Sequence, residues 1–411
     1  MSQIKVALIV ATAAAAVIAG SMTGTTDAAS APPPPGSVSP AVVTGHPAMG
    51  YNTWYQYRTS ADEADVLAQG RALVSGGLAA AGYSTVNLDD GWMSPRRNSA
   101  GNLVEDPAKF PDGMAALAGK LHAMGLRLGV YEAIGTRTCQ GYPGSSGHYK
   151  QDAALFASWQ VDYVKIDDCG GYPAGTTESS LASLHAQYGG DLRADSPSLL
   201  YSQELPVPFI GSSQFIPAVS SSARWANSWR VAPDEYGAAT VVIDRNLNAG
   251  IHLHTFAHSG HWNDLDMVLP PSIMPSPSAA AYLTDEQTQL SGWAMEASPV
   301  LISANLATLS AAELTALKNP DMIAIDQSGA QSALEVTHAH VEAFVKPADG
   351  GTALFMTNTG TGTASAAYTL SQLGIPAARV TSRNIWTGRT TTFGGIATTL
   401  AAGTSVMLVV K

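Results

Sequence analysis

The sequence predicts a parallel α/β barrel followed by a small antiparallel β-sandwich. The chain has 411 residues, which exceeds the roughly 100–200 residues of one compact domain but suits a barrel of roughly 250 residues plus a smaller domain. From residue 49 to about residue 325, short apolar segments alternate with Ala- and Leu-rich segments of helical spacing, a pattern typical of parallel strands joined by crossover helices. After about Gln327 the helical spacing ends, and short strands between Gly- and Thr-rich turns predict the sandwich.

Each part of the chain has its own set of expected elements. In the barrel, short apolar runs predict strands, and apolar residues three or four positions apart predict helices. The predicted barrel strands are 83–88, 126–131, 161–166, 199–202, 223–228, 252–256 and 297–302, and the predicted helices include 114–124 and 152–159. The predicted sandwich strands are 341–345, 353–357, 367–370, 380–386 and 406–410.

The N-terminal residues have the features of a secretory signal peptide. Lys5 precedes a short apolar run over residues 6–18, and small residues follow through Ser30. The run is shorter than the roughly 20 apolar residues needed to span a bilayer. Four consecutive prolines then predict an extended linker. We expect a signal peptide over 1–30, a proline-rich linker over 31–45, the barrel over 46–327 and the sandwich over 328–411, in a secreted or periplasmic protein without a membrane span.

The composition favours a neutral, polar ligand. Hydrophobic residues make up 45% of the chain, which is enough for a sizeable core, and charged residues only 13%, below the typical ~25%. The formal net charge is −11, and no run rich in Lys and Arg occurs. A nucleic-acid partner or an anionic membrane is therefore not expected.

The chain contains two cysteines, Cys139 and Cys169. An even pair in an exported protein indicates one disulfide bond. Two buried free thiols are the alternative. Closing a loop of this length would stabilise the fold by about 3–4 kcal/mol on the chain-entropy model.

Two carboxylates follow strands that are expected to lie close together in the barrel. In the segment VDYVKIDDC at 161–169, Lys165 and Asp167 are two positions apart, so both side chains leave a strand on the same face. Asp234 follows about two βα units later, at roughly 31 residues for each unit of a barrel. The carboxyl ends of barrel strands carry the active site, so the two carboxylates can face one pocket. A partly exposed ion pair at a strand end is the alternative.

A carboxylate pair at strand ends is the minimum apparatus for glycoside hydrolysis. In the retaining version one carboxylate attacks the anomeric carbon, and the other protonates the leaving oxygen and then activates water. Lys165 beside Asp167 would lower the pKa of that carboxyl and favour a nucleophile. Arg230 near Asp234 opposes the protonated acid, unless its guanidinium is directed at the substrate or at another carboxylate.

Further polar and aromatic residues could hold a sugar. Asp89 and Asp90 come directly after a predicted strand, and ionised carboxylates accept the hydrogen bonds that sugar hydroxyls donate. The indoles of Trp54, Trp92 and Trp229 offer flat apolar faces for a sugar ring. The alternatives are a helix N-cap for the aspartates and core packing for the tryptophans.

Four histidines lie late in the barrel region, at His252, His254, His258 and His261. A His-x-His pair on a strand could hold a metal. In metal-dependent barrel hydrolases, however, that pair lies on the first strand. We therefore expect packing or hydrogen-bonding roles and no metal.

Several motifs resemble those of glycoside hydrolase family 27, the family of α-galactosidases and α-N-acetylgalactosaminidases. They occur in the family's order and cover the chain from Pro47 to the C-terminus. The motifs are MGYNTW at 49–54, NLDDGW at 87–92, TC at 138–139 with PGS at 143–145, VDYVKIDDC at 161–169, SQE at 202–204, SWR at 228–230 with Asp234, and HWNDLDM at 261–267.

The resemblance implies a (β/α)8 TIM barrel followed by a β-sandwich, and a retaining enzyme that releases terminal α-linked galactose without a cofactor or metal. It implies that Asp167 is the nucleophile and Asp234 the acid/base. It also implies a disulfide between Cys139 and Cys169 at the edge of the pocket. The implied substrate-binding residues are Asp89, Asp90 and Lys165 for the galactose hydroxyls, Trp54 for packing on the sugar, and Arg230 with Glu204 at its 2-position.

The chain departs from the family at two neighbours of Glu204. Gln203 replaces a residue that is often cysteine, and Leu205 replaces a common tryptophan. Because Glu204 is retained, the resemblance favours galactose over N-acetylgalactosamine. A β-L-arabinopyranosidase, an α-N-acetylgalactosaminidase, a carbohydrate-binding protein without turnover and a metal-dependent hydrolase are the alternatives. The sequence leaves the leaving group and the oligomeric state open.

Overall fold

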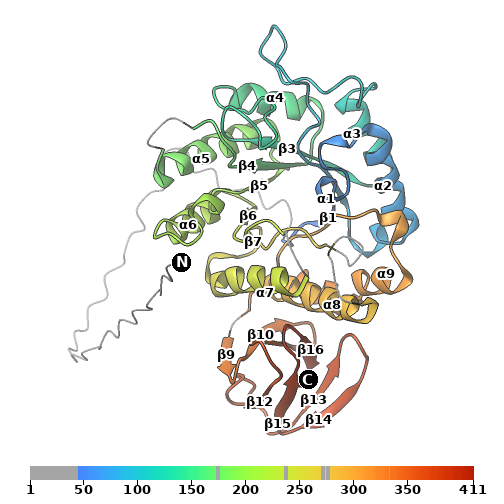
Figure 1. The fold of residues 1–411 in the computed structure, drawn as a ribbon, viewed down its shortest axis with the longest axis vertical. Coiled ribbons are helices and arrows are strands. Elements are labelled where there is room, and N and C mark those ends of the chain that lie inside the picture. The colour runs from blue at the N-terminus through green and yellow to red at the C-terminus, as the bar shows by residue number, and fades with distance from the viewer. Residues whose placement is uncertain (1–44, 173–175, 236–238, 270–273, 275–277, 333) are drawn as a thin grey trace, which may run out of the picture. The chain divides into compact units, whose positions relative to one another are not determined.

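The computed structural model describes residues 45–411 except for 173–175, 236–238, 270–273, 275–277 and 333 (Figure 1). The expected signal peptide and nearly all of the expected linker lie outside the described residues. Within them, the predicted fold class is confirmed: a parallel barrel sheet is followed by antiparallel sheets. No helix in the described ranges combines the length and the apolar character needed to cross a membrane.

Among the described residues, eight parallel strands form the barrel sheet, in the order β7-β6-β5-β4-β3-β2-β1-β8. Neighbouring strands are in register, as where Tyr51 of β1 pairs with Val86 of β2. The ring is completed just beyond β7, where Val268 forms a parallel bridge to Ile302 of β8. The strands are β1 (Met49–Asn52), β2 (Thr85–Leu88), β3 (Arg127–Ala133), β4 (Tyr163–Asp167), β5 (Leu200–Gln203), β6 (Ser228–Arg230), β7 (Trp262–Asp264) and β8 (Val300–Ile302).

Helices cover the outer face of this sheet, so its strands are buried on both faces; every residue of β1, β2 and β5 is buried. Helix α2 begins at a capping box, in which Asp62 and Asp65 each accept the other's backbone N–H. The helices are α1 (Trp54–Tyr57), α2 (Glu63–Ser75), α3 (Met114–Ala123), α4 (Tyr149–Ser158), α5 (Glu178–Asp195), α6 (Phe215–Trp225), α7 (Ala239–Gly250), α8 (Ala279–Glu296), α9 (Ala311–Leu317) and α10 (Pro320–Asp326).

Two of the predicted barrel strands are wrong. Residues 223–228 contain the end of α6 and only the first residue of β6, and the buried residues of α6 recur at helical spacing. Residues 252–256 belong to the 3-10 helix Ile251–Phe256, whereas β7 is Trp262–Asp264. The alternation of residues 252–256 resembles a strand, but Leu253 is the only fully buried residue among them.

The C-terminal part is a sandwich of two antiparallel sheets. One has the order β14-β13-β16-β11-β10-β9, and the other pairs β12 with β15. Their facing side chains form a separate apolar core that includes Leu354, Tyr368 and Ile396. The strands are β9 (Leu334–His338), β10 (Val341–Ala348), β11 (Gly351–Asn358), β12 (Ala364–Thr369), β13 (Val380–Asn384), β14 (Thr390–Phe393), β15 (Gly395–Leu400) and β16 (Ser405–Val410). The sequence prediction lacked β9, β14 and β15.

The sandwich packs on the barrel through its larger sheet. Phe344 and Phe355 belong to the same apolar cluster as the barrel core. The buried Lys346 donates to the carbonyl oxygen of Ala294, near the end of α8, at 2.7 Å. The continuous core makes the two parts one compact unit.

Candidate active site

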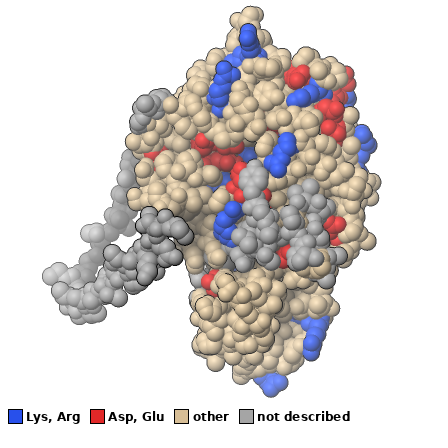
Figure 2. Space-filling view, viewed as in Figure 1, with Lys and Arg blue, Asp and Glu red and all other residues tan. Residues whose placement is uncertain are grey.

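A cavity of about 140 Å³ opens at the carboxyl ends of the barrel strands. Figure 2 shows acidic side chains gathered in a hollow on the barrel, whereas the same face of the sandwich carries few charged residues. All lining residues but Cys139 and Gln140 lie in the last three residues of a strand or within four residues after its end, which is where barrel folds carry their functional groups. The lining residues are Trp54, Tyr55, Asp89, Asp90, Tyr131, Cys139, Gln140, Lys165, Asp167, Cys169, Arg230, Asp234, Asp266 and Met267.

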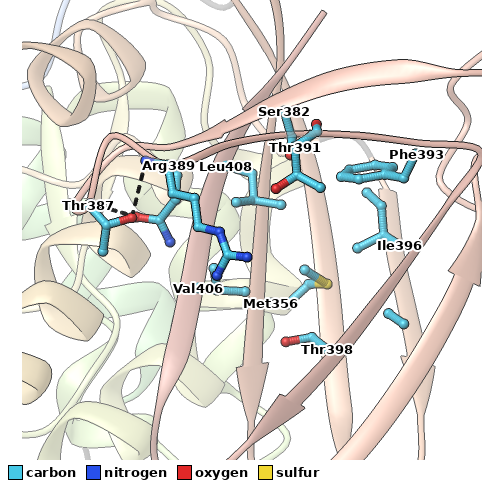
Figure 3. Close-up of a pocket in the computed structure, with 12 residues that line it drawn as sticks. Met356, Ser382, Thr387, Arg389, Thr391, Phe393, Ile396, Thr398, Val406 and Leu408 are labelled. Atoms are coloured by element: carbon cyan, nitrogen blue, oxygen red, sulfur yellow. Dashed lines mark hydrogen bonds between the residues drawn. The ribbon is translucent and has the colours of Figure 1, made fainter.

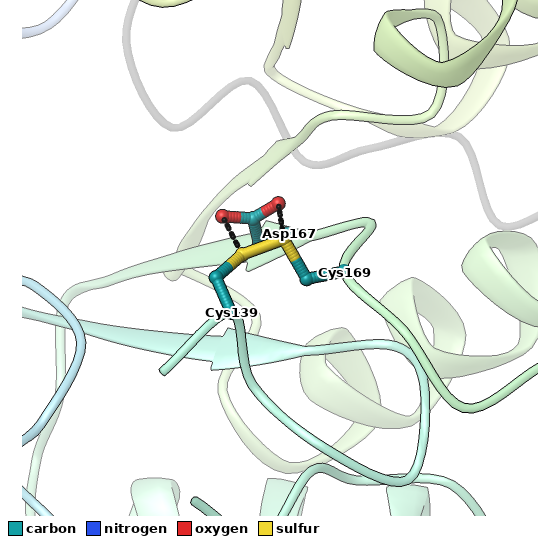
Figure 4. Close-up of side chains that lie close together, drawn as sticks. All are labelled: Cys139, Asp167 and Cys169. Carbon is teal, nitrogen blue, oxygen red and sulfur yellow. Dashed lines mark hydrogen bonds between the residues drawn. A yellow bond between two sulfur atoms is a disulfide. The ribbon is translucent and has the colours of Figure 1, made fainter. Parts of the chain in front are cut away.

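Asp167, the last residue of β4, has a well-defined set of contacts. The hydroxyl of Tyr131 donates to Oδ2 at 3.0 Å, and the backbone N–H of Asp168 donates to Oδ1 at 2.7 Å. The carboxylate also lies against the Cys139–Cys169 disulfide, with sulfur–oxygen distances of 3.1 and 3.6 Å (Figure 4). Because the sulfurs lie this close to the carboxylate, they shield Asp167 from water on this side.

The charges around Asp167 act in opposite directions. Burial raises the pKa of Asp167 well above its usual value, and the neighbouring Glu204 raises it further. Lys165 and the Tyr131 hydroxyl lower the pKa, but they do not outweigh burial. The expected lowering by Lys165 is therefore present, although it does not set the net direction. Because Asp167 stays partly exposed to the cavity, water there can solvate its ionised form.

The disulfide also bears on whether the residues around Asp167 could bind a metal ion. Among the described residues, Cys139, Asp167 and Cys169 form a group whose potential ligand atoms lie close enough together to hold a metal ion. The two sulfurs are bonded to each other, so neither is a thiolate that could bind a metal. The free-thiol alternative is wrong, and the group does not fit a metal site.

The two consecutive aspartates after β2 present acceptors to the cavity. Oδ2 of Asp89 accepts from Asn52 Nδ2 at 2.8 Å and lies 3.4 Å from Lys165 Nζ. Oδ2 of Asp90 accepts the backbone N–H of Gln140 at 2.9 Å, while its Oδ1 is buried without a partner among the described residues. Burial raises the pKa of Asp90 to about 6. An unsatisfied buried acceptor of this kind suits a donor from a bound ligand.

A chain of alternating charges runs along one side of the cavity. Glu204 Oε1 lies 3.1 Å from Lys165 Nζ and 3.4 Å from Arg230 Nη1. Nη2 of Arg230 lies 2.6 Å from Asp266 Oδ2 and 2.9 Å from Asp234 Oδ1. Glu204 is enclosed between the two cations and does not line the cavity. Arg230 is directed at three carboxylates, so its charge is shared rather than held by Asp234 alone.

Asp234 and Asp266 differ sharply in exposure. The side chain of Asp234 is 51% exposed, whereas that of Asp266 is 2% exposed. Burial raises the pKa of Asp266 to about 7. The neighbouring Glu235 is also buried, and burial raises its pKa well above its usual value. Its carboxylate accepts from the side-chain amide of Gln289 at 3.1 Å.

The other aromatic and histidine candidates differ in whether they reach the cavity and in the element on which they lie. Trp54 lines the cavity, whereas Trp92 and Trp229 are fully buried in the core. His252 and His254 lie in the 3-10 helix Ile251–Phe256 instead of on a strand. The rings of His258 and His261 lie 4.4 Å apart, centroid to centroid.

Sequence reasoning missed several residues that line the cavity. Asp266 and Met267 lie inside the segment HWNDLDM at 261–267, for which no site role is predicted from the sequence. Tyr55 and Gln140 each follow a predicted site residue directly, and Tyr131 ends the predicted strand 126–131. Adjacency to a predicted site residue or strand end is therefore the signal that could have found them.

A second cavity, of about 460 Å³, lies in the sandwich. Its walls include Met356, Phe393 and Leu408, and Arg389 extends along it (Figure 3). It is larger than the barrel cavity, yet none of the described residues that line it is a carboxylate. It therefore lacks the groups that acid–base hydrolysis requires, and the barrel cavity is the candidate active site.

Known proteins resemble this chain over both of its parts. A family described as "Alpha galactosidase A" matches residues 47–328, and one described as "Alpha galactosidase C-terminal beta sandwich domain" matches residues 338–410. The chain is 32% identical over 356 residues to "Probable alpha-galactosidase A" of Aspergillus clavatus, covering 83% of this chain and 66% of that protein. It thus spans about two thirds of that relative's length.

A bacterial relative and a solved structure agree with these matches. The chain is 32% identical over 321 residues to "Alpha-galactosidase A" of Cellvibrio japonicus, covering 74% of each protein. The crystal structure of α-galactosidase I from Mortierella vinacea superposes with a TM-score of 0.78 at 23% identity, covering 90% of this chain and 98% of that one. At that identity the superposition supports the fold alone. The chain belongs to glycoside hydrolase family 27, and it is a glycosidase of the α-galactosidase family.

Proposed function

We propose that this enzyme releases terminal α-linked galactose with retention of configuration, using Asp167 as the nucleophile and Asp234 as the acid/base. One observation carries the proposal: both carboxylates line a single cavity but differ in their environments. Asp167 is held by two donated hydrogen bonds and shielded by the disulfide. Asp234 is 51% exposed at the side chain, where it can reach a leaving group and water.

The reaction would proceed in two displacements. In the first, a carboxylate oxygen of Asp167 bonds to the anomeric carbon and the bond to the leaving oxygen breaks. The proton of Asp234 passes to that oxygen. In the second, ionised Asp234 takes a proton from water, whose oxygen bonds to the anomeric carbon. The ester bond to Asp167 breaks as this new bond forms, and galactose is freed.

Several residues would bind the galactose ring. The carboxylates of Asp89 and Asp90 are suited to accept hydrogen bonds from sugar hydroxyls, and Oδ1 of Asp90 has no other partner in the described structure. Lys165 can donate to a hydroxyl, and Trp54 offers an apolar face. Glu204 would act at the 2-position through Arg230 and Lys165, because it does not itself reach the cavity.

Hydrolysis of three nitrophenyl glycosides tests the proposal: the α-galactoside, the α-N-acetylgalactosaminide and the β-L-arabinopyranoside. We expect a clear preference for the α-galactoside, unaffected by chelator, and loss of turnover in Asp167→Ala without loss of folding. Asp234→Ala should retain the first step on nitrophenyl substrates, because a good leaving group needs less acid assistance. Near-normal activity of Asp167→Ala would remove it from the role of nucleophile.

We also infer export and a two-part chain. Lys5 and the apolar run over residues 6–18 support a signal peptide over 1–30. The change of element type between α10 and β9 supports the boundary between a barrel over 46–327 and a sandwich over 328–411. The N-terminal sequence of protein recovered outside the cytoplasm tests the first inference: a start at Met1 would contradict it.

A further inference from the structure

Arg58 contacts two aromatic walls of the cavity at once. Its guanidinium carbon lies 5.1 Å from the ring centroid of Trp54 and 5.0 Å from that of Tyr55. Both rings line the cavity, whereas Arg58 does not. The three residues belong to the short segment that follows β1, in which Arg58 caps the end of α1. Arg58 therefore reaches the site through the two rings.

The backbone of Arg58 adopts a conformation that favours glycine. Its φ is 53° and its ψ is −131°, where a side chain is disfavoured by contacts of Cβ with the backbone. A residue in such a region persists only when the surrounding structure compensates for the strain. The two cation–ring contacts contribute to this compensation, as does the hydrogen bond that the Arg58 backbone N–H donates to the carbonyl oxygen of Trp54. What distinguishes Arg58 is that its side chain contacts two rings of the cavity wall.

Tyr55 links these contacts to the catalytic groups. Its backbone N–H donates to Ser303 Oγ at 2.9 Å. Burial, together with Asp266 and Asp234, raises the pKa of Tyr55 above its usual value, so the phenol stays neutral. The ring that Arg58 contacts thus lines the same cavity as Asp234 and Asp266.

We propose that Arg58 is a positioning residue that fixes the rings of Trp54 and Tyr55 for galactose binding without touching the sugar. The inference rests on the proposed function, because it assigns galactose to the cavity. Arg58 then affects the affinity for the galactose unit and has no effect on binding of the leaving group. The strained backbone lowers stability in exchange for an ordered wall.

The test compares Arg58→Gly with Arg58→Lys. Glycine relieves the backbone strain and removes the guanidinium, so the melting temperature should rise by about 2–4 °C. The Kd of galactose, measured by calorimetry, and the KM of nitrophenyl α-galactoside should both rise by about 5–20-fold. The kcat should change less than about twofold, because Arg58 does not contact the reacting atoms. Arg58→Lys keeps a cation over the rings and should stay within about threefold of the unmodified protein.

Gln160 provides a matched control. It also has a positive φ, of 60°, but it is exposed and does not line the cavity. Gln160→Gly should raise the melting temperature in the same way and leave galactose affinity unchanged. The control separates relief of strain from loss of the ring contacts.

Two results would overturn the inference. One is galactose affinity of Arg58→Gly within about twofold of the unmodified protein. The other is a rise in KM without a change in galactose affinity, which would place Arg58 in contact with the leaving group. If the unmodified protein binds no galactose, the proposed function fails instead. Should Arg58→Gly not fold, the strain argument is wrong and the inference fails with it.

Discussion

Arg230 and Asp266 form a tight ion pair beside the candidate acid/base: Nη2 of the arginine lies 2.6 Å from Oδ2 of the aspartate. The same nitrogen lies 2.9 Å from Oδ1 of Asp234. Asp266 thus takes up part of the positive charge that would otherwise act on Asp234. This sharing answers the objection that Arg230 keeps its neighbour from acting as an acid.

Asp266→Asn should selectively impair substrates that need acid assistance. Without the Asp266 charge, Arg230 pairs more strongly with ionised Asp234, which cannot donate a proton. We expect kcat/KM to fall by about 10–100-fold for an α-galactoside with a sugar leaving group, and by much less for the nitrophenyl galactoside. Asp349→Asn, at an exposed site of the sandwich, serves as the control. Equal losses on both substrates would contradict this role.

Galactose binding should weaken in acid because of Asp90. Burial raises the pKa of Asp90 to about 6. Above that pH the carboxylate only accepts hydrogen bonds, and below it one oxygen carries a proton. We therefore expect the Kd of galactose to rise as the pH falls from 7 to 5. In Asp90→Asn, affinity should be about 10–100-fold weaker and nearly constant over that range. A variant that keeps the full pH dependence would assign it to another group.

The Cys139–Cys169 disulfide should support both stability and turnover. Replacing both cysteines by serine should lower the free energy of unfolding by about 3–4 kcal/mol on the chain-entropy model, as measured by urea denaturation. It should also lower kcat, because the sulfurs lie against the Asp167 carboxylate. A reducing agent should have the same effect on the unmodified protein and no effect on the double variant. Unchanged kcat would limit the bond to a structural role.

Glu286 should destabilise the fold as the pH rises. Neither of its buried carboxyl oxygens has a partner among the described residues, and burial raises its pKa from 4.5 to about 8. Between those values the folded state binds more protons than the unfolded state, so its contribution falls as the pH increases. Glu286→Gln should thus be more stable by roughly 1–3 kcal/mol at pH 8.

The difference for Glu286→Gln should nearly vanish at pH 4, where both states are protonated. Urea denaturation at the two pH values measures it. Asp349→Asn, which changes an exposed carboxylate, should show no such trend. A stabilisation equal at both pH values would rule out ionisation as its cause.

The sequence was most informative where local pattern and tertiary environment agree. The segment 161–169 is apolar up to its carboxylates, so it predicted both β4 and the place of Asp167 at the strand end. The predicted position of β7 is wrong because residues 252–256 alternate like a strand but form a 3-10 helix. The three-residue strand Trp262–Asp264 is too short for a period of two to stand out.

The site was less predictable than the fold because its neighbours depend on three-dimensional packing. Asp234 and Arg230 are four positions apart, and their pairing could be foreseen. That Asp266 shares the guanidinium depends on how β6 and β7 align. The position of Glu204 behind two cations also arises from strands that meet only in the folded barrel.

The bridge from Val268 to Ile302 links closure of the barrel to completion of the active-site cavity. The contact that closes the ring of strands is made by the same piece of chain that places Asp266 and Met267 in the cavity wall. A molecule in which the contact between Val268 and Ile302 is broken would lack one wall of its substrate site. Turnover therefore requires that the ring be closed at this contact, because closure of the ring and completion of the cavity wall depend on the same piece of chain.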